Sequence, residues 1–447
     1  MKRDIVIIGG GPAGMITAIT AKANHPDKSI VFIRKEERTL TPCGIPYIFS
    51  TLGTVEKDMV PDDPFLNKGL EIIIDEALDV NTKEKKIVLA SKGELEYEKL
   101  VFATGSEPIR PKWLTGSDLE NVFVIKKDHK YLQNVKDILK EQKKIAVIGA
   151  GFIGVEMSDE LATDGKEVFL IEKLPYILGR AFDEDFTKDM QKTLSNKGIN
   201  ILTGSGVKEL KGNGKVEKVI LENGKEVEVD SVILSMGYAP QVSVAKKAGI
   251  LITSTGGIWV DEYMRTSVED VFAVGDCTQR INFITRRPTP TMLASTATSE
   301  ARVAGSNLYN IQNLKAFNGT IAIFSTKVDG IVIGSAGATE SEAKASDFEV
   351  ITGDFEGMDR HPGTIPGAGK QKVKLVVAKR SGIIIGGQIS GGESASELVN
   401  VLGFIIQNRM RVDEVYTSQI GTHPLTTSAP TKYPLIKAAE AAMMKNI

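Results

Sequence analysis

An unbroken apolar run marks the start of the chain as a buried strand. Ile5-Val6-Ile7-Ile8 shows no alternation, which is typical of a parallel strand covered on both faces. The glycine-rich turn Gly9-Gly10-Gly11-Pro12-Ala13-Gly14 follows, and then an alanine-rich segment that predicts a helix to about Asn24. Ile30-Val31-Phe32-Ile33 predicts the next strand. The N-terminal segment is therefore predicted to form one strand–turn–helix–strand unit.

The same order of elements returns about 140 residues later. Ile145-Ala146-Val147-Ile148 precedes Gly149-Ala150-Gly151-Phe152-Ile153-Gly154, a predicted helix and the run Val168-Phe169-Leu170-Ile171. Each Gly-x-Gly-x-x-Gly turn thus follows an apolar strand and opens a helix, which is the context that dinucleotide binding requires. The chain is therefore predicted to contain two Rossmann-like dinucleotide-binding units.

The glycines of these turns have distinct expected roles. The first permits the tight turn, the second lets the backbone approach a pyrophosphate, and the third allows the helix to pack on the strand. The helix N-terminus then faces the negative charge. Two structural turns in an empty α/β protein are the alternative. We assign these turn residues to cofactor binding: Gly9, Gly11, Pro12, Ala13, Gly14, Gly149, Gly151, Phe152, Ile153 and Gly154.

The end of the second strand in each unit bears on which nucleotide binds. Glu172 ends this strand in the second unit, where a carboxylate accepts hydrogen bonds from both ribose hydroxyls and repels a 2′-phosphate. NADH is therefore favoured, but the neighbouring Lys173 weakens the argument and leaves NADPH open. The first unit has Arg34-Lys35-Glu36 here, and Arg34 and Lys35 are cofactor-binding candidates. Either Glu36 reaches back to the ribose, or Lys35 and backbone groups hold it.

The character of the sequence changes after about Phe317. Apolar runs such as Val373-Lys374-Leu375-Val376-Val377 and Ile383-Ile384-Ile385 alternate with turns before predicted helices close the chain. This pattern predicts a separate α+β domain of about 130 residues. The segment from Phe355 to Lys370 is rich in glycine and proline, and we expect it to be an ordered loop.

Composition narrows the partners and the compartment. The net charge of -2 over 447 residues gives no reason to expect a nucleic acid partner. No apolar run approaches the roughly 18 residues that cross a bilayer, so no membrane association is expected. Two cysteines, Cys43 and Cys277, fit a reducing compartment, which predicts the cytoplasm. No residues are assigned to a metal.

Further stretches carry a family resemblance. Residues 97–106 and 266–276 resemble the FAD signatures of flavoproteins with two dinucleotide folds, and residues 230–238 resemble the strand that closes the NAD domain. Together with Cys43 and the two glycine turns, they make about residues 1–447 similar to the pyridine nucleotide-disulfide oxidoreductase family. The branch that it resembles most has a single redox cysteine and contains coenzyme A-disulfide reductases, NADH oxidases and NADH peroxidases.

The resemblance implies a fold, two cofactors and a homodimer. We expect an α/β protein with two Rossmann-like domains, one for FAD (1–112 and 250–316) and one for NADH or NADPH (113–249), plus a C-terminal α+β dimerisation domain (317–447). In the family, the aspartate matching Asp276 binds the ribityl chain, and the segment matching Met292-Leu293-Ala294 lies by the isoalloxazine. The resemblance adds these cofactor-binding candidates: Thr104, Gly105, Gly237, Gly275, Asp276, Leu293 and Ala294.

Cys43 is the central chemical candidate, because it stands alone where redox flavoenzymes usually place two sulfurs. No Cys-x-x-Cys or Cys-x4-Cys pair exists, so a thiol beside a flavin would serve one external sulfur or peroxide at a time. Its neighbours in Thr41-Pro42-Cys43-Gly44-Ile45-Pro46-Tyr47 place it at a turn that opens a helix, and we expect the helix N-terminus and the flavin to lower its pKa. A small buried hydrophobe is the alternative. We expect Cys277 to be packed near the cofactor and unreactive.

Departures from the family pattern bear on the activity. NADH oxidases and peroxidases of this branch carry a histidine where this chain has Pro12, which argues against efficient peroxide or four-electron oxygen chemistry. The stretches that match the C-terminal tyrosines of coenzyme A-disulfide reductases, residues 364–366 and 422–425, contain none. His423-Pro424 resembles the pair that supplies a general acid from the partner subunit. His423 is therefore a catalytic candidate, with a structural histidine as the alternative.

The sequence supports three hypotheses for the activity. The first is an FAD-dependent NAD(P)H:sulfur oxidoreductase that reduces a disulfide, polysulfide or persulfide of a small thiol such as coenzyme A through Cys43. The second is an NAD(P)H oxidase that reduces oxygen, with Cys43 cycling through a sulfenate. The third is an electron-transfer flavoprotein module for a partner protein, in which Cys43 is incidental.

Overall fold

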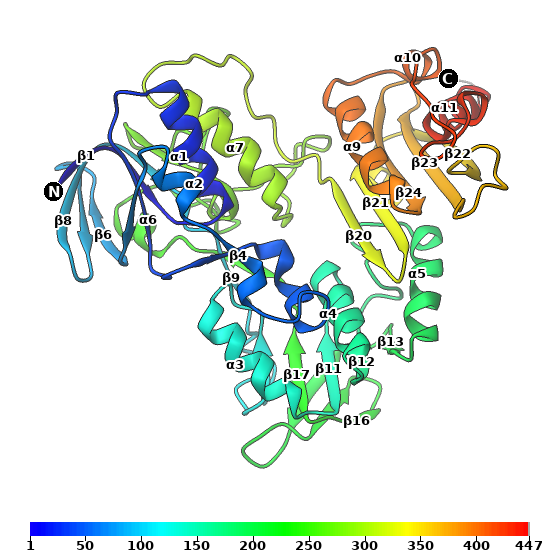
Figure 1. The fold of residues 1–447 in the computed structure, drawn as a ribbon, viewed down its shortest axis with the longest axis horizontal. Helices are drawn as coiled ribbons and strands as arrows, with labels where there is room; N and C mark the ends of the chain where they lie inside the picture. The colour runs from blue at the N-terminus through cyan, green and yellow to red at the C-terminus, as the bar shows by residue number, and fades with distance from the viewer. Residues whose placement is uncertain (446–447) are drawn as a thin grey trace.

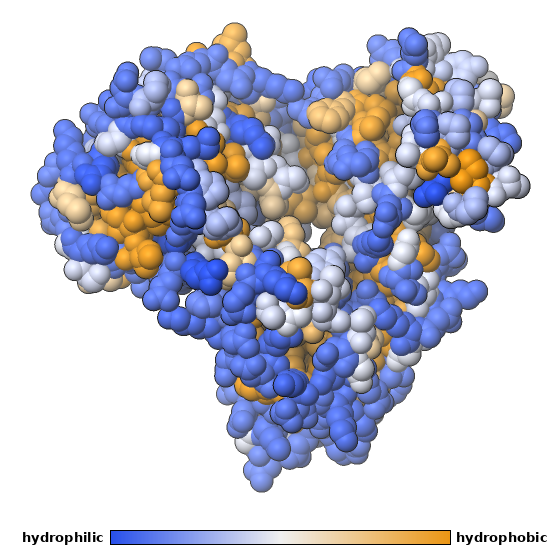
Figure 2. All heavy atoms as spheres, viewed as in Figure 1, coloured by the Kyte–Doolittle hydropathy of each residue, from blue (hydrophilic) through white to orange (hydrophobic). Residues whose placement is uncertain are grey.

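The computed structural model of the chain describes residues 1–445 and has three lobes (Figure 1). The first lobe contains the N-terminus, the second the middle of the chain, and the third the C-terminus. Figure 2 shows a hollow where the three lobes meet, with apolar side chains on part of its wall. Within residues 1–445, no helix combines the length and the apolar character that crossing a membrane requires.

The first lobe is built on a mixed sheet whose central strands are parallel. The strand order is β5-β2-β1-β8-β7-β6, and β19 pairs with the end of β8. The strands are β1 (Lys2–Ile8), β2 (Ile30–Arg34), β5 (Glu71–Ile74), β6 (Ala77–Asn81), β7 (Lys86–Leu89), β8 (Gly93–Phe102) and β19 (Val271–Ala273). The helices are α1 (Pro12–Asn24), α2 (Asp63–Leu66), α6 (Ser243–Lys247) and α7 (Ala294–Ser306), and α1 packs on α7.

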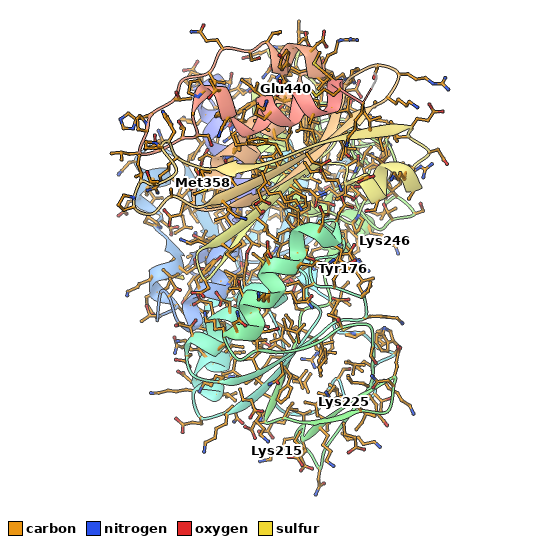
Figure 3. All side chains as sticks on the ribbon, turned by 90° about the vertical axis from the view of Figure 1, so that its right-hand side faces the viewer. Tyr176, Lys215, Lys225, Lys246, Met358 and Glu440 are labelled. Carbon is orange, nitrogen blue, oxygen red and sulfur yellow. The ribbon has the colours of Figure 1, made fainter. Side chains whose placement is uncertain are left out.

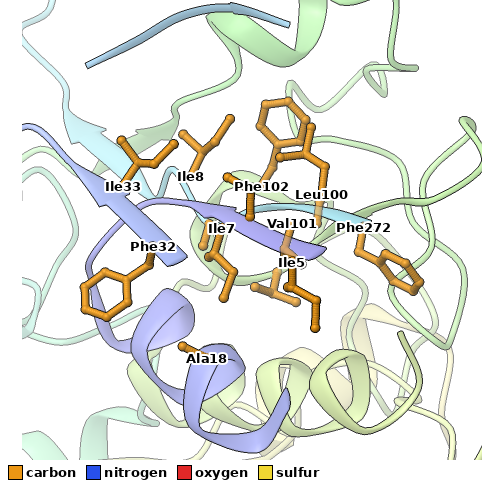
Figure 4. Close-up of a cluster of buried hydrophobic side chains, with 14 of the residues drawn as sticks. Ile5, Ile7, Ile8, Ala18, Phe32, Ile33, Leu100, Val101, Phe102 and Phe272 are labelled. Atoms are coloured by element: carbon orange, nitrogen blue, oxygen red, sulfur yellow. The ribbon is translucent and has the colours of Figure 1, made fainter. Parts of the chain in front are cut away.

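Apolar strands form the core of this lobe, as their sequence predicts. Ile5 and Ile7 on β1, Phe32 on β2 and Phe102 on β8 are fully buried and lie close together (Figure 4). Parallel strands are covered on both faces, which is why β1 and β2 lack the alternation of a half-exposed strand. The glycine turn ends at α1, where Pro12 occupies the first helical position that proline favours. The first predicted strand–turn–helix–strand unit is therefore confirmed.

The second lobe repeats this arrangement. Its parallel sheet has the order β10-β17-β11-β12-β13, and a small antiparallel sheet of β14, β15 and β16 lies beside it. The strands are β10 (Val122–Val124), β11 (Lys144–Ile148), β12 (Glu167–Ile171), β13 (Asn200–Leu202), β14 (Val207–Lys211), β15 (Lys218–Leu221), β16 (Glu226–Glu228) and β17 (Ser231–Leu234). The helices are α3 (His129–Lys140), α4 (Phe152–Thr163) and α5 (Glu184–Asn196). The second predicted unit, β11-turn-α4-β12, is confirmed.

The third lobe is the predicted α+β domain. Its antiparallel sheet has the order β20-β21-β24-β23-β22. The strands are β20 (Phe324–Val328), β21 (Ile331–Gly337), β22 (Val350–Met358), β23 (Lys370–Ala378) and β24 (Ile384–Gly391). The helices are α8 (Glu340–Ala345), α9 (Ser394–Gln407), α10 (Val412–Tyr416) and α11 (Pro434–Met443). In the side view of Figure 3, Glu440 and Met358 lie at this end of the molecule, and Lys215 and Lys225 lie at the opposite end of the second lobe.

One local prediction in this lobe is wrong in part. The expected loop from Phe355 to Lys370 begins later, because residues 355–358 complete β22. Each of them pairs with a residue of β23, from Phe355 with Val373 to Met358 with Lys370. Backbone pairing with a strand from further along the chain outweighs the local glycine and proline content.

Short elements connect the lobes. The strand pair β3 (Thr39–Leu40) and β4 (Met59–Val60) flanks the cysteine segment, and β9 (Ser106–Pro108) pairs with β18 (Tyr238–Pro240). The 3₁₀ helices are η1 (Pro42–Phe49), η2 (Glu56–Asp58), η3 (Gly275–Cys277) and η4 (Pro430–Lys432).

Helix α4 belongs to the second lobe and contacts both of the other two. Ile45 and Ile48 of η1 are buried in the same apolar cluster as Val155 of α4. The buried Glu160 carboxylate accepts hydrogen bonds from the backbone N–H (2.7 Å) and the hydroxyl (2.6 Å) of Thr51. Towards the third lobe, the Phe152 ring stacks on the Phe324 ring with 4.9 Å between centroids. The cysteine segment and the third lobe are thus both attached to the helix that follows the second glycine turn.

Candidate active site

A single cavity of about 2030 Å³ joins the two glycine turns and Cys43. Residues of all three lobes form the wall of this cavity. The two glycine turns and Cys43 therefore line it from separate parts of the chain. The candidates that line it are Gly9, Gly11, Pro12, Ala13, Arg34, Lys35, Cys43, Thr104, Gly105, Gly149, Gly151, Phe152, Ile153, Glu172, Gly237, Asp276, Leu293 and Ala294.

The two glycine turns have the same geometry. Gly9 and Gly149 have φ angles of +126° and +101°, and a Cβ on either would collide with the backbone of the neighbouring strand end. At Gly11 and Gly151, by contrast, a Cβ would meet nothing within 4 Å, because these positions face the cavity. The space in front of each helix N-terminus suits a pyrophosphate, so both turns fit a dinucleotide.

The remaining glycine candidates lie behind the cavity wall. A Cβ on Gly14 would lie 1.9 Å from the carbonyl oxygen of Gly9, and one on Gly154 would lie 1.8 Å from that of Gly149. Gly275 has a φ of +80°, and a Cβ added to it would lie 2.7 Å from the Cβ of Ala13. These three glycines allow the backbone of neighbouring segments to pack closely, and they do not line the cavity.

The strand ends of the two units differ. Glu172 accepts hydrogen bonds from the backbone N–H of Ala150 (2.7 Å) and of Leu174 (2.8 Å), which hold its carboxylate beside the second glycine turn. Arg34 occupies the matching position of the first unit, but its guanidinium turns inward and forms a bidentate pair with Asp62 (2.6 and 2.7 Å). Its remaining donors bind nearby backbone and hydroxyl oxygens, so they are committed inside the protein.

Asp276 lies in a polar group that joins the first two lobes. The Ser106 hydroxyl donates to Asp276 Oδ2 (2.9 Å), and the Lys127 ammonium lies 3.4 Å from the same oxygen. Lys127 also donates to the Ser106 hydroxyl (3.1 Å). The sequence did not indicate a site role for Ser106, the last residue of the FAD-like stretch 97–106, or for Lys127, which lies in a connecting segment without a motif.

Cys43 is exposed on the cavity wall, near the start of η1. The predicted turn that opens a helix is therefore present. Cys277 is free as well, but it is fully buried, and its sulfur contacts the carbonyl oxygens of Phe102 (3.5 Å) and Val274 (3.2 Å). The two thiols thus have the different environments that the sequence analysis expects.

Burial is the largest influence on the Cys43 pKa that the protein itself provides. Protein atoms behind the thiol withdraw it from water and raise its pKa, and the carboxylates of Glu156, Asp276 and Asp58 act in the same direction. Lys127 is the cation that opposes them. The predicted lowering of this pKa includes the effect of a bound flavin as well as that of the N-terminus of η1, and it stays a prediction for the protein with FAD bound.

Glu156 is a further residue of the cavity that the motifs did not indicate. It lies on α4, lines the cavity and accepts a hydrogen bond from the Thr326 hydroxyl (2.8 Å). Burial, together with the charge of Glu160, raises its pKa to about 7. The sequence signal that could have indicated it is the pair Glu156 and Glu160, spaced i, i+4 on the helix after the second glycine turn. Burial of two carboxylates on one helix has a high free-energy cost, which points to a functional role.

His423 lies apart from Cys43 within one chain. It is exposed in the third lobe, and it does not line the cavity. The backbone N–H of Leu425 donates to His423 Nδ1 (3.3 Å), which leaves Nε2 to carry the proton of the neutral ring. His361 supports the His423 loop, because its backbone N–H donates to the Pro424 carbonyl oxygen (3.2 Å) and its Nδ1 lies 3.0 Å from the Thr427 carbonyl oxygen.

Two dinucleotide sites that open on one cavity with a lone thiol define a redox flavoprotein with two dinucleotide folds. The chain belongs to the pyridine nucleotide-disulphide oxidoreductase family, whose model matches residues 3–301, and the family's dimerisation domain matches residues 323–433. Members of this family use FAD and NAD(P)H, and the two glycine turns fit these cofactors. The chain is therefore an NAD(P)H-dependent flavin oxidoreductase.

Relatives of this chain carry two kinds of name. An NADH oxidase from Methanocaldococcus jannaschii and an NAD(P)H coenzyme A polysulfide/persulfide reductase from Pyrococcus horikoshii are each 32% identical, with 98% of both chains covered. The solved structure of an NAD-dependent persulfide reductase from A. fulgidus has a TM-score of 0.90 and 29% identity. It covers 100% of this chain and 83% of that one. The fold and the reductant are thus common to relatives whose names state different acceptors.

Replacing Asp276 with alanine is expected to weaken FAD binding. The change removes the charged acceptor that Ser106 holds at the cavity, and loss of a charged hydrogen bond of about 1.5–3 kcal/mol corresponds to roughly ten- to a hundredfold weaker binding. The ratio of flavin to protein absorbance after dialysis measures the effect. Glu269→Ala, an exposed carboxylate before β19, is the control. Full retention of FAD in the Asp276→Ala variant would show that Asp276 is not needed for FAD binding.

Replacing Glu172 with glutamine is expected to raise the use of NADPH relative to NADH by about tenfold, or ~1.4 kcal/mol. The amide keeps the shape and one acceptor, but it no longer repels a 2′-phosphate. The ratio of kcat/KM for the two nucleotides is the measurement. Glu167→Gln, at the other end of β12, is the control. A wild-type protein that already prefers NADPH tenfold would contradict the assignment.

Proposed function

We propose that the chain is an NAD(P)H:sulfur oxidoreductase that reduces a disulfide, polysulfide or persulfide of a small thiol through Cys43. The observation that carries this proposal is the place of Cys43. Its thiol is exposed on the wall of the cavity that both glycine turns share. Among the described residues, it is the single cysteine there, so a mixed disulfide with an external sulfur is its available redox partner.

The two cofactors have separate places in this proposal. FAD would be held by the turn from Gly9 to Gly14, by Asp276 and by Leu293 and Ala294, and it would supply the two-electron link between the nucleotide and the Cys43 sulfur. NAD(P)H would be held by the turn from Gly149 to Gly154 and by Glu172. Both sets of residues open on the same cavity, which supports a direct path between the two sites.

Cys43 acts as the nucleophile in the proposed reaction. Its thiolate attacks one sulfur of the acceptor R–S–S–R′, the sulfur–sulfur bond breaks, and R′–S⁻ leaves while Cys43–S–S–R forms. The two electrons of one NAD(P)H then return the mixed disulfide to the Cys43 thiolate and a second thiolate, R–S⁻. One proton is released by the thiol at the start, and the leaving thiolates take up protons at the end.

Features of the chain favour sulfur over oxygen as the acceptor. Pro12 lines the cavity where NADH oxidases and peroxidases of the branch carry a histidine. The relative from Pyrococcus horikoshii is named a polysulfide/persulfide reductase. An oxidase that reduces oxygen is the second candidate, because the relative from Methanocaldococcus jannaschii is named an NADH oxidase. In either case, we place the protein in the cytoplasm, where its unpaired thiols stay reduced.

We also propose that the active unit is a homodimer formed through the third lobe. The family's dimerisation domain matches residues 323–433 and supports this assembly. His423 is exposed in that lobe, and its Nε2 is free to approach the cavity of the other subunit. In this arrangement, His423 of the partner subunit protonates the leaving thiolate.

Cys43→Ser is expected to lower thiol production by about a hundredfold or more, because a serine hydroxyl is neither nucleophilic nor redox active at neutral pH. The assay combines NADH, a disulfide and a polysulfide without oxygen, and it measures released thiol. Cys277→Ala is the matched control, since that thiol is buried. An altered oxygen product without a loss of thiol production would favour the oxidase. No change in any assay would favour the electron-transfer module.

His423→Ala is expected to slow disulfide reduction by roughly ten- to a thousandfold and polysulfide reduction by less. An acid helps most when the leaving thiol is basic, with a pKa near ~8.5, and polysulfide leaving groups are more acidic. Steady-state rates on both acceptors at several pH values measure this difference, with His129→Ala as the control. Equal losses on both acceptors would remove the acid role, and no loss on either would make His423 structural.

A further inference from the structure

The Asp58 side chain is packed against the backbone that follows Cys43. A Cβ added to Gly44 would lie 1.9 Å from Asp58 Oδ1 and 2.8 Å from its Cγ. The Asp58 residue is only 5% exposed, so the carboxylate lies inside the protein and not in the solvent. A glycine is therefore required at position 44 because the Asp58 carboxylate fills the space of a side chain there.

The backbone holds Asp58 in this position. Its carbonyl oxygen accepts a hydrogen bond from the N–H of Thr41 (2.9 Å), two residues before the cysteine. The next residue, Met59, pairs with Leu40 in the β3–β4 ladder. These contacts fix the Asp58 backbone relative to the strands that carry the cysteine segment.

The Asp58 carboxylate also lacks the partners that a buried charge usually has. Among residues 1–445, no donor binds its buried Oδ2. Burial raises the Asp58 pKa to about 6, with no cation to oppose the effect. A buried carboxylate without donors is costly, and such groups are retained mainly where their charge or their proton has a use.

The charges around Cys43 come from four separate elements. Glu156 on α4, Asp276 on η3 and Asp58 on η2 raise the pKa of the thiol, and Lys127, which precedes α3, lowers it. Tyr47 on η1 lines the same cavity, and burial raises its own pKa so that it stays neutral. Among the three carboxylates, Asp58 is the one packed directly on the backbone of the cysteine segment. The negative charge of Asp58 disfavours the thiolate form of Cys43, because neighbouring like charges raise the free energy of one another's ionised form.

We propose that Asp58 is a positioning residue of the Cys43 site, which fixes the backbone beneath the sulfur through Gly44 and holds Cys43 in the thiol form through its negative charge. When Asp58 takes up a proton, the same thiol becomes easier to ionise. The inference rests on the proposed role of Cys43, but it concerns the thiol itself and not the acceptor. It can therefore be tested without any sulfur substrate.

The experiment measures alkylation of Cys43 by iodoacetamide in the FAD-loaded protein after reduction and desalting, with the modified peptide identified by mass spectrometry. The thiolate displaces iodide, so the rate follows the thiolate fraction. Asp58→Asn keeps the shape of the side chain and removes its charge. We expect it to raise the rate at neutral pH by about two- to tenfold, since tenfold corresponds to one pKa unit. Glu56→Gln, an exposed carboxylate on the same 3₁₀ helix, is expected to leave the rate unchanged.

The pH profile separates an electrostatic role from a structural one. In the wild type, the logarithm of the rate should rise with unit slope, flatten near pH 6 as Asp58 ionises, and then resume its rise. Asp58→Asn should lose this step while keeping any step near pH 7 from Glu156, whose pKa is about 7. Superimposable wild-type and Asp58→Asn profiles would overturn the electrostatic role. This outcome would leave the proposed function intact, because that function depends on the Cys43→Ser assay.

A second pair of variants tests the contact with Gly44. Gly44→Ala is expected to lower the melting temperature and to change the Cys43 alkylation rate, because its methyl group overlaps Asp58 Oδ1. Adding Asp58→Ala should restore both properties at least in part, since it removes the overlapping oxygen. Gly44→Ala and the double variant still test the contact between Gly44 and Asp58 if the Asp58→Asn protein folds poorly. A Gly44→Ala protein with wild-type stability and alkylation would overturn the positioning role.

Discussion

The packing of α4 against the cysteine segment is the contact on which the site depends. Ile45 and Ile48 enter the apolar cluster of the second lobe, and Glu160 accepts two hydrogen bonds from Thr51 at the end of the same segment. One helical turn earlier, Glu156 is bound to Thr326 of the third lobe. The glycine turn that opens α4 is therefore connected through one rigid helix to the thiol and to the third lobe. Without this contact, the two dinucleotide sites would not share a cavity with Cys43.

The same contact determines the electrostatics of the thiol. It brings Glu156, whose pKa is raised to about 7, next to a segment that already carries Asp58, while Lys127 supplies the opposing charge. The protein's own groups therefore favour the protected thiol form of Cys43 over the thiolate. A protected thiol reacts slowly with adventitious oxidants. Activation then requires a change of charge in the cavity, which cofactor binding or proton uptake by a carboxylate can provide.

Local signals in the sequence were sufficient to predict the strands, turns and helices of the two dinucleotide-binding units. They were insufficient to predict side-chain directions and pKa values in the site. Both glycine turns, their strands and the helix after Pro42 were predicted, because each depends on residues within one short window. The side-chain direction of Arg34 depends on Asp62, and the pKa of Cys43 depends on α4, η2 and η3. The same limit applies to residues 355–358, which pair with β23 despite their composition. Ser106 and Lys127 meet at Asp276 only after the first two lobes have come together.

The proposed reaction needs a proton donor near Cys43, and a second subunit would add a donor of a different kind from those of one chain. A leaving thiolate needs a proton at the sulfur, and one candidate donor that lines the cavity of one chain is Glu156, whose pKa burial raises to about 7. A histidine that keeps its proton on Nε2 does not line this cavity, because His423 is exposed in the third lobe. A carboxylic acid titrating near pH 7 loses its proton as the pH rises. If the second subunit supplies His423, the site gains a donor outside this group of carboxylates. Such a division of proton donors between two subunits would give the proposed dimerisation through the third lobe a part in the chemistry.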